Sequence, residues 1–488
     1  MQIAKNGSAV PVFQNGRTLF SAYNPERDAE SFFSAHKEAF DTAGCILVGG
    51  IGNGLHLKIL SEQYPEKQII AFEADEVSLA FSKANLVCPL ESVVMTEISQ
   101  LNYILPANYL PALHGNFAFA SIRSWSDNLK DRMDTILSMI NGVISTISAD
   151  YSVQAQFGKL WHRNILVNLK HYDAIQDKQT FDFNGFETGG RKAAIIGAGP
   201  SLDESILTLI EHRKEFCVFS TDTAFGTLKA AGITPDFIVT VDSQSISEQH
   251  FIGHNLKGTV LAADLTANSS IIRKAINQNC PLLLFHNNHP LSLLIDEWLS
   301  SVKHTESPFP SIDSGAGTVL HAAVDLSRKL DFQEQVFFGA DFSYINGKPY
   351  TKGTYLEQQF FACEKRTANG ETAYNKVMFR SPLISLSSDI YTTEVLKRYQ
   401  KALESYLDNG YNQNKITIAP PHPVKMADFT SWYLEKLQKK DKKVLFSLLP
   451  LFAWYKKNFL NADTESVYAF AEQNTADVGR IQCHQRKK

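Results

Sequence analysis

The chain has 488 residues, of which 44% are hydrophobic and 20% are charged, and its formal net charge is −4. These values are typical of a globular protein with several domains, each with its own core, and they do not favour a nucleic-acid partner. No apolar run is long enough for a signal peptide or a membrane span, so we expect neither. The six cysteines are spread singly, without the spacing of a zinc site or a disulfide framework, and this favours a reducing, cytoplasmic location.

Residues 1–125 predict a small Rossmann-like domain. The segment CILVGGIGNGLHLKIL, beginning at Cys45, is typical of a strand, a glycine turn and a helix. The next strand ends at Glu73, about twenty residues past the turn, where nucleotide-binding sheets often hold a ribose. Leu55 replaces a glycine of the dinucleotide pattern. We therefore prefer a structural role for this domain over an active cofactor site.

Residues 126–190 predict a helical connector. Apolar residues recur at spacings of three and four in 127–147 and again in 153–172, which predicts two helices. The polar segment 173–190 has little periodicity and predicts a domain boundary.

Residues 191–425 predict a central α/β domain with a Rossmann-like parallel sheet. Six short apolar segments are typical of strands buried on both faces: 193–196, 216–220, 237–241, 260–263, 282–285 and 335–339. Ligands of such sheets lie beyond the carboxyl ends of the strands. Residues 345–380 break the rhythm and predict a structureless lid or binding loop. Residues 426–488 predict a C-terminal helical region, and the fold class is therefore α/β with a helical end.

The segment AAIIGAGPSLDE, from Ala193 to Glu204, predicts a phosphate-binding turn. Its glycines allow close approach of a ligand, and Ser201 with Glu204 predicts a capping box that opens a helix toward the turn. The alternative is an ordinary strand-to-helix turn, because Leu202 stands where a dinucleotide fingerprint has its third glycine.

Two further segments add polar groups at the same predicted edge. Residues 313–318 (DSGAGT) predict a second helix start with exposed amides, for which plain capping is the alternative. Asp242 follows a strand, as acids do that hold a metal and a nucleotide, or it caps the next helix. Gln244 replaces the second acid of a D-x-D pair, so we assign no metal ligand and leave the need for a divalent metal open.

The ordered series GAGPSLDESI, TDTAF, PDFIVTVDSQ and DSGAGTVLHAAVDLSRKLDFQEQVFFGADFSY carries a resemblance. It is similar to the motility-associated factor (Maf) flagellin glycosyltransferases, whose central domain resembles bacterial sialyltransferases. In those sialyltransferases a G-x-G-P-S-L turn, an S-G-x-x helix start and a G-x-D-F strand end surround a CMP-activated nonulosonic acid. The match covers roughly residues 190–425, and the three-part layout of the chain agrees with the family's.

The resemblance implies inverting transfer of a sialic-acid-like sugar, such as pseudaminic or legionaminic acid, from a CMP-activated donor to Ser or Thr of flagellin. The enzyme would stabilise the departing phosphate and supply a base for the attacking hydroxyl. The expected donor-binding residues lie at the strand ends, the two helix starts and the lid: Gly197, Gly199, Pro200, Ser201, Leu202, Asp222, Thr223, Asp242, Ser243, Gln244, Ser314, Gly315, Thr318, Asp341, Phe342, Tyr350, Lys352 and Tyr355.

The catalytic base departs from the sialyltransferase pattern, which has a histidine beyond the G-x-D-F strand. After Asp341 this chain has only His422, in a proline-rich segment, and His484. The candidates are therefore Asp242, Glu357 and His289, and the sequence does not choose among them.

Two other functions remain open. One is a 6-hydroxymethylpterin pyrophosphokinase that uses ATP and magnesium, because archaeal enzymes of that kind share a similar glycine-turn domain. The other is a non-catalytic flagellin-binding chaperone that kept the fold. The expected partners are a nucleotide sugar and flagellin, and the sequence is compatible with a homo-oligomer.

Overall fold

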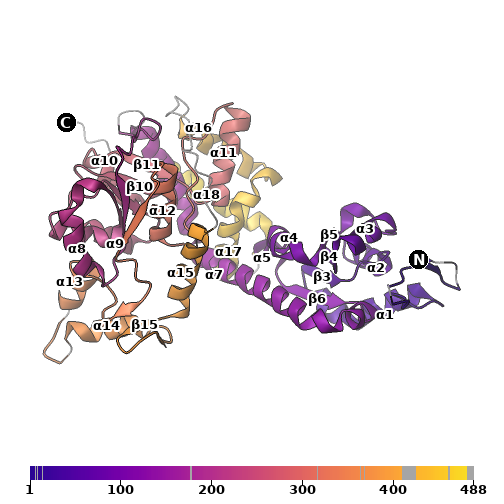
Figure 1. Cartoon of the computed structure of the whole chain (residues 1–488). Coiled ribbons are helices and arrows are strands. Elements are labelled where there is room, and N and C mark those ends of the chain that lie inside the picture. Colours follow the sequence, from indigo (N-terminus) through magenta and orange to yellow (C-terminus); the bar gives the residue numbers. More distant parts are fainter. Residues whose placement is uncertain are drawn as a thin grey trace. The chain divides into compact units, whose positions relative to one another are not determined.

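The computed structural model describes residues 1–480 except 6, 8, 14, 176–178, 316, 363, 368, 409–424, 460 and 461. Contacts divide the chain into two compact units, residues 1–158 with 449–462 and residues 159–448 with 463–488. The division falls within α7 (Lys130–Ile175), a single helix through both stretches predicted as separate helices (Figure 1). The units therefore divide differently from the expected boundaries at 125, 190 and 425, because no loop interrupts α7.

Unit 1 contains a four-stranded parallel sheet in the order β5-β4-β3-β6, which confirms a small Rossmann-like domain. Its strands are β3 (Cys45–Gly49), β4 (Gln68–Glu73), β5 (Val94–Glu97) and β6 (Phe117–Ser121). A two-stranded antiparallel pair, β1 (Gln2–Ile3) and β2 (Ala9–Val10), precedes it. The helices are α1 (Pro25–Thr42), α2 (Leu55–Gln63), α3 (Glu76–Ala84), α4 (Leu101–Asn108), α5 (Pro111–His114), α6 (Arg123–Asn128) and α17 (Leu449–Asn458), with short turns η1 (Leu90–Ser92) and η2 (Ile98–Gln100).

Unit 2 contains a six-stranded parallel sheet in the order β11-β10-β9-β8-β7-β12. All six predicted strands are confirmed to within one residue: β7 (Lys192–Ile196), β8 (Phe216–Thr221), β9 (Phe237–Thr240), β10 (Val260–Asp264), β11 (Leu282–Phe285) and β12 (Gln335–Phe338). The chain proceeds outward from β7 to β11 and then returns to place β12 on the other side of β7. The carboxyl ends of β7 and β12 are therefore a topological switch point, where ligands of such sheets bind.

Helices cover both faces of this sheet. Side chains alternate along each strand, and because they are apolar on both faces, each face needs a covering layer. Ala193 and Ile195 belong to the core on the side of α12 (Val319–Lys329), whereas Ala194 and Ile196 pack toward α8 (Leu202–Glu211) and α9 (Asp222–Ala230). Further helical elements of the sheet domain are η4 (Arg213–Glu215), η5 (Ser245–Phe251), α10 (Ser269–Asn277) and α11 (Pro290–Val302).

The predicted structureless lid is wrong, because most of residues 345–380 has regular structure. A three-stranded antiparallel sheet in the order β13-β15-β14 is made by β13 (Tyr344–Ile345), β14 (Ile384–Ser385) and β15 (Ile390–Thr392). Between β13 and β14 the chain forms α13 (Tyr355–Ala362) and α14 (Gly370–Met378), which contact each other and are drawn in orange in Figure 1. Apolar and aromatic residues, among them Phe360 and Tyr374 in edge-to-face contact, stabilise this pair.

The remaining elements of unit 2 are α15 (Glu394–Asp408), α16 (Met426–Gln438), η6 (Lys442–Val444), η7 (Phe446–Leu448) and α18 (Thr464–Arg480). The predicted helical C-terminal region is thus confirmed for the described residues, although α17 within it belongs to unit 1. His422 and His484 lie outside the described residues.

Candidate active site at the carboxyl edge of the sheet

The glycine turn after β7 and the turn after β12 form one tightly packed joint. The Gly199 amide donates to the Gly339 carbonyl at 2.8 Å. A Cβ on Gly197 would lie 2.4 Å from the Gly339 oxygen, and a Cβ on Gly339 would lie 2.5 Å from the Gly197 oxygen. Because such distances exclude any side chain, both positions require glycine. The sequence signal was correct in placing these turns together, and the glycines serve backbone contact between them.

Asp341 occupies the start of α8, where a phosphate was expected. Its carboxylate accepts the Ser201 amide at 2.8 Å and a short hydrogen bond from the Ser201 hydroxyl. The predicted capping box is wrong. The Ser201 hydroxyl donates to Asp341 and does not accept the Glu204 amide, so Ser201 makes no side-chain cap. The amides of Leu202, Asp203 and Glu204 donate to carbonyls of the same turn. An internal carboxylate therefore already takes the favourable position at the positive end of this helix.

The start of α12 is the second expected anion site, and it lies beside the same joint. A Cβ on Gly197 would be 3.3 Å from Leu320 Cδ1. Thr318 caps α12 by accepting the His321 amide, and Gly315 donates its amide to Asp313. The first amides of a helix have no acceptor within the helix. The amides of Val319 and Leu320 therefore make no hydrogen bond inside α12. The start of α12 thus offers amide donors to a ligand, whereas the amides at the start of α8 already donate to groups of the protein.

Two carboxylates and a histidine gather beyond β8 and β9. Asp222 is buried and accepts hydrogen bonds from the Thr240 hydroxyl and the Thr223 amide. Burial raises the pKa of Asp242, the nearby charge of Asp222 raises it further, and the Gln244 amide opposes this by donating to Asp242 Oδ1 at 2.9 Å. Both carboxylates act electrostatically on His250 of η5. These residues form a polar cluster beyond the carboxyl ends of β8 and β9.

The segment that follows β13 reaches across this edge. The Thr351 amide donates to the Ala198 carbonyl at 3.0 Å, and its hydroxyl donates to Asp203 at 2.6 Å. The Lys352 amide also donates to Asp203, while the Lys352 carbonyl accepts the Thr227 hydroxyl. Because these bonds tie the segment to α8 and α9, it is anchored over the glycine turn, and the Lys352 side chain is left exposed.

Three tyrosines and one arginine lie within electrostatic range of one another around Tyr350. Burial raises the pKa of Tyr350, with further increases from Tyr344 and Tyr355, while the charge of Arg380 lowers it. Burial also raises the pKa of Tyr355, and the charge of Asp242 adds to the effect. These hydroxyls therefore stay protonated at neutral pH and can donate hydrogen bonds to an anion. Arg380 supplies the cation.

The three candidate bases lie in different surroundings. His289 caps α11, where its Nδ1 accepts the Leu291 amide at 3.1 Å, and burial lowers its pKa to about 3. Both Glu357 oxygens accept hydrogen bonds within the protein, from the Gly353 amide and the Tyr374 hydroxyl. Only Asp242 lies in the polar cluster. The structure thus separates the three residues that sequence reasoning grouped as equivalent.

Several residues that shape this edge were missed from sequence. Asn164 of α7 donates to the carbonyls of Ser243 and Thr266, and Asn168, one turn later, donates to those of Leu265 and Ala267. They hold the loops after β9 and β10. A pair of asparagines four residues apart in an apolar helical pattern was the available signal, since a buried amide needs partners.

The remaining predicted ligands occupy the same edge. Ser243 and Ser314 are buried, whereas Gln244 is exposed. Phe342 has a left-handed backbone with φ of 45°, which a bulky residue adopts rarely and which is common at functional turns. Its carbonyl accepts the Thr392 hydroxyl at 2.8 Å, which ties the turn to β15.

The corresponding crevice of unit 1 is filled by the protein itself. Glu73 accepts the amides of Ile51 and Gly52 at 2.7 and 2.9 Å through one oxygen and Trp125 Nε1 at 2.9 Å through the other. The Trp125 ring covers the glycine turn so closely that a Cβ on Gly50 would lie 2.7 Å from it. The acid predicted to hold a ribose is therefore fully engaged, as a structural role requires.

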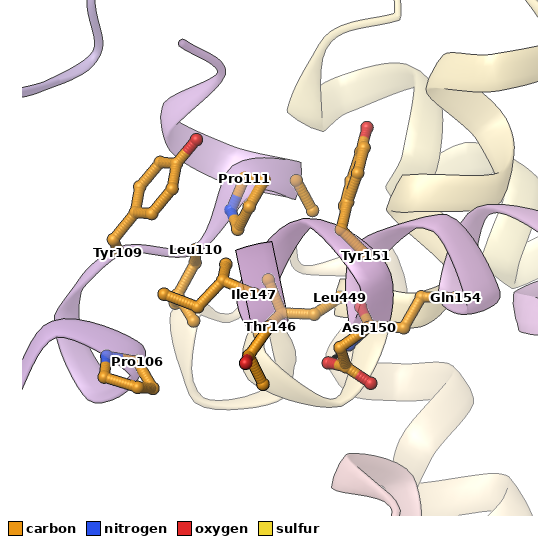
Figure 2. A pocket seen from close by; sticks show the side chains of 11 residues that line it. Pro106, Tyr109, Leu110, Pro111, Thr146, Ile147, Asp150, Tyr151, Gln154 and Leu449 are labelled. Atoms are coloured by element: carbon orange, nitrogen blue, oxygen red, sulfur yellow. Dashed lines mark hydrogen bonds between the residues drawn. The ribbon is translucent and has the colours of Figure 1, made fainter. Parts of the chain in front are cut away.

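Unit 1 also has a hollow of about 230 Å³ between the α4–α5 segment and α7, shown in Figure 2. Pro106, Leu110 and Ile147 give it an apolar lining, and Asp150 is the one charged group among its lining residues. None of its lining residues carries a cationic side chain, whereas sites for phosphorylated ligands commonly contain arginine or lysine. The nucleotide site is thus better sought at the edge of unit 2.

Metal ligands and membrane spans were also searched. Within the described part of the chain, no three His, Cys, Asp or Glu side chains are grouped so as to hold a metal ion. Among the same residues, no helix combines the length and the apolar character needed to cross a bilayer.

Unit 2 is a Rossmann-like α/β domain whose polar side chains gather at its topological switch point. Residues 163–347 match a family model described as 6-hydroxymethylpterin diphosphokinase MptE-like. The matched range contains the whole six-stranded sheet and ends after β13. The match covers well under half of the chain, so it is a similarity of the sheet domain and leaves the activity of the whole protein to be argued.

The chain is also similar to three uncharacterized proteins of Treponema pallidum (strain Nichols). They are 36%, 28% and 23% identical over 139, 196 and 325 residues, or 28%, 40% and 64% of this chain. The chain spans 64%, 66% and 53% of their lengths. A solved structure, the MAf glycosyltransferase from Magnetospirillum magneticum AMB-1, is 14% identical with a TM-score of 0.49, covering 98% of this chain and 85% of that one.

Proposed function

We propose that the chain is a glycosyltransferase that moves a nonulosonic, sialic-acid-like sugar from a CMP-activated donor to Ser or Thr hydroxyls of flagellin, in the cytoplasm. The observation that carries the proposal is the meeting of the motif series at one switch point. The turn at Gly197, the turn at Gly339 and the start of α12 lie in contact, although they are far apart in sequence.

The reaction would be a direct displacement at the anomeric carbon of the sugar. The bond from that carbon to the acceptor oxygen forms as its bond to the phosphate oxygen breaks, and CMP leaves with the electron pair. The acceptor hydroxyl gives its proton to a base. The protein therefore has to stabilise negative charge on the phosphate and accept one proton.

The described residues can meet the first demand without a grouped set of metal ligands. The α12 start offers amides beside the joint, and the hydroxyls of Tyr350 and Tyr355 stay protonated. Arg380, which lies within electrostatic range of Tyr344 and Tyr350, would supply the positive charge. We place the donor phosphate among these groups. The α8 start is the poorer site because Asp341 occupies it.

A second candidate is a 6-hydroxymethylpterin diphosphokinase, which the name of the matched family model favours. Diphosphoryl transfer from ATP would use magnesium, which is commonly held by one or two carboxylates together with the substrate phosphates. Asp222 and Asp242 are the pair that such a reaction would recruit. A non-catalytic flagellin-binding protein is the third outcome of the test below.

Nucleotide binding separates these functions. We expect CMP at about one hundred times its Kd to stabilise the protein by about 2.7 kcal/mol in thermal unfolding, and ATP with magnesium to have no effect. Stabilisation by ATP with magnesium alone would favour the kinase, and no effect of either nucleotide would favour the binding protein.

Arg380 gives a sharper version of the same test. We expect Arg380→Ala to weaken CMP binding by roughly ten- to a hundred-fold, because a hydrogen bond to a charged group contributes about 1.5–3 kcal/mol. Lys376→Ala, an exposed cation on α14 four residues earlier, is the matched control and should bind CMP like the parent. Equal affinity of the parent and the Arg380 variant would contradict our placement of the phosphate.

A further inference from the structure

His250 is a half-buried histidine at the edge of the polar cluster. The sequence patterns did not single it out. It lies in η5, and its ring meets the Tyr355 ring edge-on at 4.8 Å. Its Nδ1 is buried and has no hydrogen-bond partner among the residues that the structure describes. A buried ring nitrogen of His56, His289 and His321 is likewise without a hydrogen-bond partner among the described residues. What distinguishes His250 is its place against Tyr355 and beside the two carboxylates of the polar cluster.

The charges around His250 suit a group that accepts a proton transiently. Burial lowers the pKa of His250, so the ring is neutral at pH 7 and keeps a lone pair on one nitrogen, while the charges of Asp222 and Asp242 act in the opposite sense. The two carboxylates would stabilise the imidazolium once a proton has arrived.

The other charged groups near η5 lie on the elements that pack against it. On α10, Lys274 donates to the Phe251 carbonyl and interacts with the charge of Glu248. On α9, Lys229 acts on His254, and the hydroxyl of Tyr355 comes from α13. The acidic pair is therefore the charge that bears on His250 itself.

We propose that His250 is the general base of the transfer reaction, a role that rests on the proposed glycosyltransferase function. A neutral imidazole nitrogen takes the proton of the acceptor hydroxyl as the acceptor oxygen bonds to the anomeric carbon and CMP departs. Asp222 and Asp242 hold the resulting positive charge by electrostatic attraction. The proton leaves to solvent when the product has dissociated.

His250 fits this role better than the three bases predicted from sequence. His289 is buried as a helix cap, and Glu357 has both oxygens engaged. Asp242 already uses one oxygen to accept the Gln244 amide. Asp242 is accordingly a positioning residue, which stabilises the charged form of His250.

The test compares His250→Asn with the parent in a CMP-release assay with flagellin and a CMP-nonulosonate donor. We expect kcat/KM to fall by about 10²- to 10⁴-fold, the usual contribution of a general base, while CMP still stabilises the variant as it does the parent. His254→Gln, a histidine four residues away against Phe225, is the matched control and should keep its activity.

The pH profile supplies a readout that a structural role would not move. For the parent, kcat/KM should decline on acidification as His250 becomes protonated, with a midpoint below the ordinary histidine pKa, and this decline should be absent in His250→Asn. Asp242→Asn should shift the decline to lower pH, because the charge that raises the pKa of His250 has gone.

The outcomes separate this inference from the function on which it rests. An active parent together with a His250→Asn variant of equal activity and an unchanged pH profile would overturn the assignment of the base alone. A parent that releases CMP from no nonulosonate donor would overturn the proposed function and the base together. Loss of activity with retained CMP binding and a lost acidic limb would support both.

Discussion

The hydrogen bonds from Ser201 to Asp341 can be tested against the capping box that the sequence predicts, because the two arrangements assign stability to different carboxylates. In the structure, Asp341 accepts both the amide and the hydroxyl of Ser201, whereas Glu204 is exposed on α8. Asp341→Asn removes the charge and keeps the shape. Glu204→Gln makes the same chemical change at the residue that the capping box would use, in the first turn of α8.

The expected magnitude follows from the contacts that each carboxylate makes. Hydrogen bonds to a charged group contribute about 1.5–3 kcal/mol, and a negative charge at a helix N-terminus adds about 0.3–1 kcal/mol. Asp341 is half-buried and asparagine retains one acceptor oxygen, so we expect Asp341→Asn to destabilise the start of α8 by about 2 kcal/mol. Glu204→Gln should cost less than about 0.5 kcal/mol, as exposed charges do.

Hydrogen exchange followed by mass spectrometry reports this region separately from the rest of the chain. A loss of about 2 kcal/mol should accelerate exchange in the first turn of α8 by about thirty-fold in Asp341→Asn. The Glu204→Gln variant should exchange within about twofold of the parent. Faster exchange in Glu204→Gln than in Asp341→Asn would refute the role of the hydrogen bonds from Ser201 to Asp341 and would favour the capping box.

Three further predictions concern buried side chains, two in unit 2 and one in unit 1. Asn164→Leu leaves the carbonyls of Ser243 and Thr266 without their donor, so we expect a loss of roughly 2–5 kcal/mol in urea unfolding; a loss below 1 kcal/mol would show that these carbonyls find water. Burial raises the pKa of Asp264 to about 6, so the native state binds its proton more tightly than the unfolded chain. Stability should therefore fall by about 2 kcal/mol as pH rises from 4 to 6, and Asp264→Asn should remove that part of the slope; an unchanged slope would contradict the assignment. Trp125→Phe removes the indole donor to Glu73, and we expect unit 1 to lose about 1.5–3 kcal/mol in thermal unfolding; an unchanged midpoint would mean that the carboxylate is satisfied otherwise.

All six strands of the larger sheet, and β3 and β4 of the smaller one, could be predicted because short apolar runs between glycine and polar residues are typical of buried parallel strands. The position of the Gly197 and Gly339 turns at one edge of the sheet could be predicted for the same reason, whereas the pairing of β7 with β12 that brings the two turns into contact could not. The partner of Ser201 could not be predicted. Asp341 lies 140 residues away, and local spacing favoured Glu204 instead.

Residues without local periodicity account for the other differences. The helices α13 and α14 lie in a segment rich in Gly, Lys, Tyr and Thr, and packing between them outweighs their weak helical pattern. His250 and Arg380 stand in polar stretches where nothing marks one side chain above another. Their importance comes from neighbours on other elements, such as Asp222 and Tyr350, which only the folded chain brings near.

The most direct test of the proposed transfer is the intact mass of flagellin after incubation with the protein and a CMP-nonulosonate donor. We predict that flagellin gains the mass of one or more nonulosonic acid residues while an equal amount of CMP appears, and that neither change occurs when the donor is replaced by ATP with magnesium. An unchanged flagellin mass with every CMP-nonulosonate donor, and no release of CMP, would contradict the proposed function.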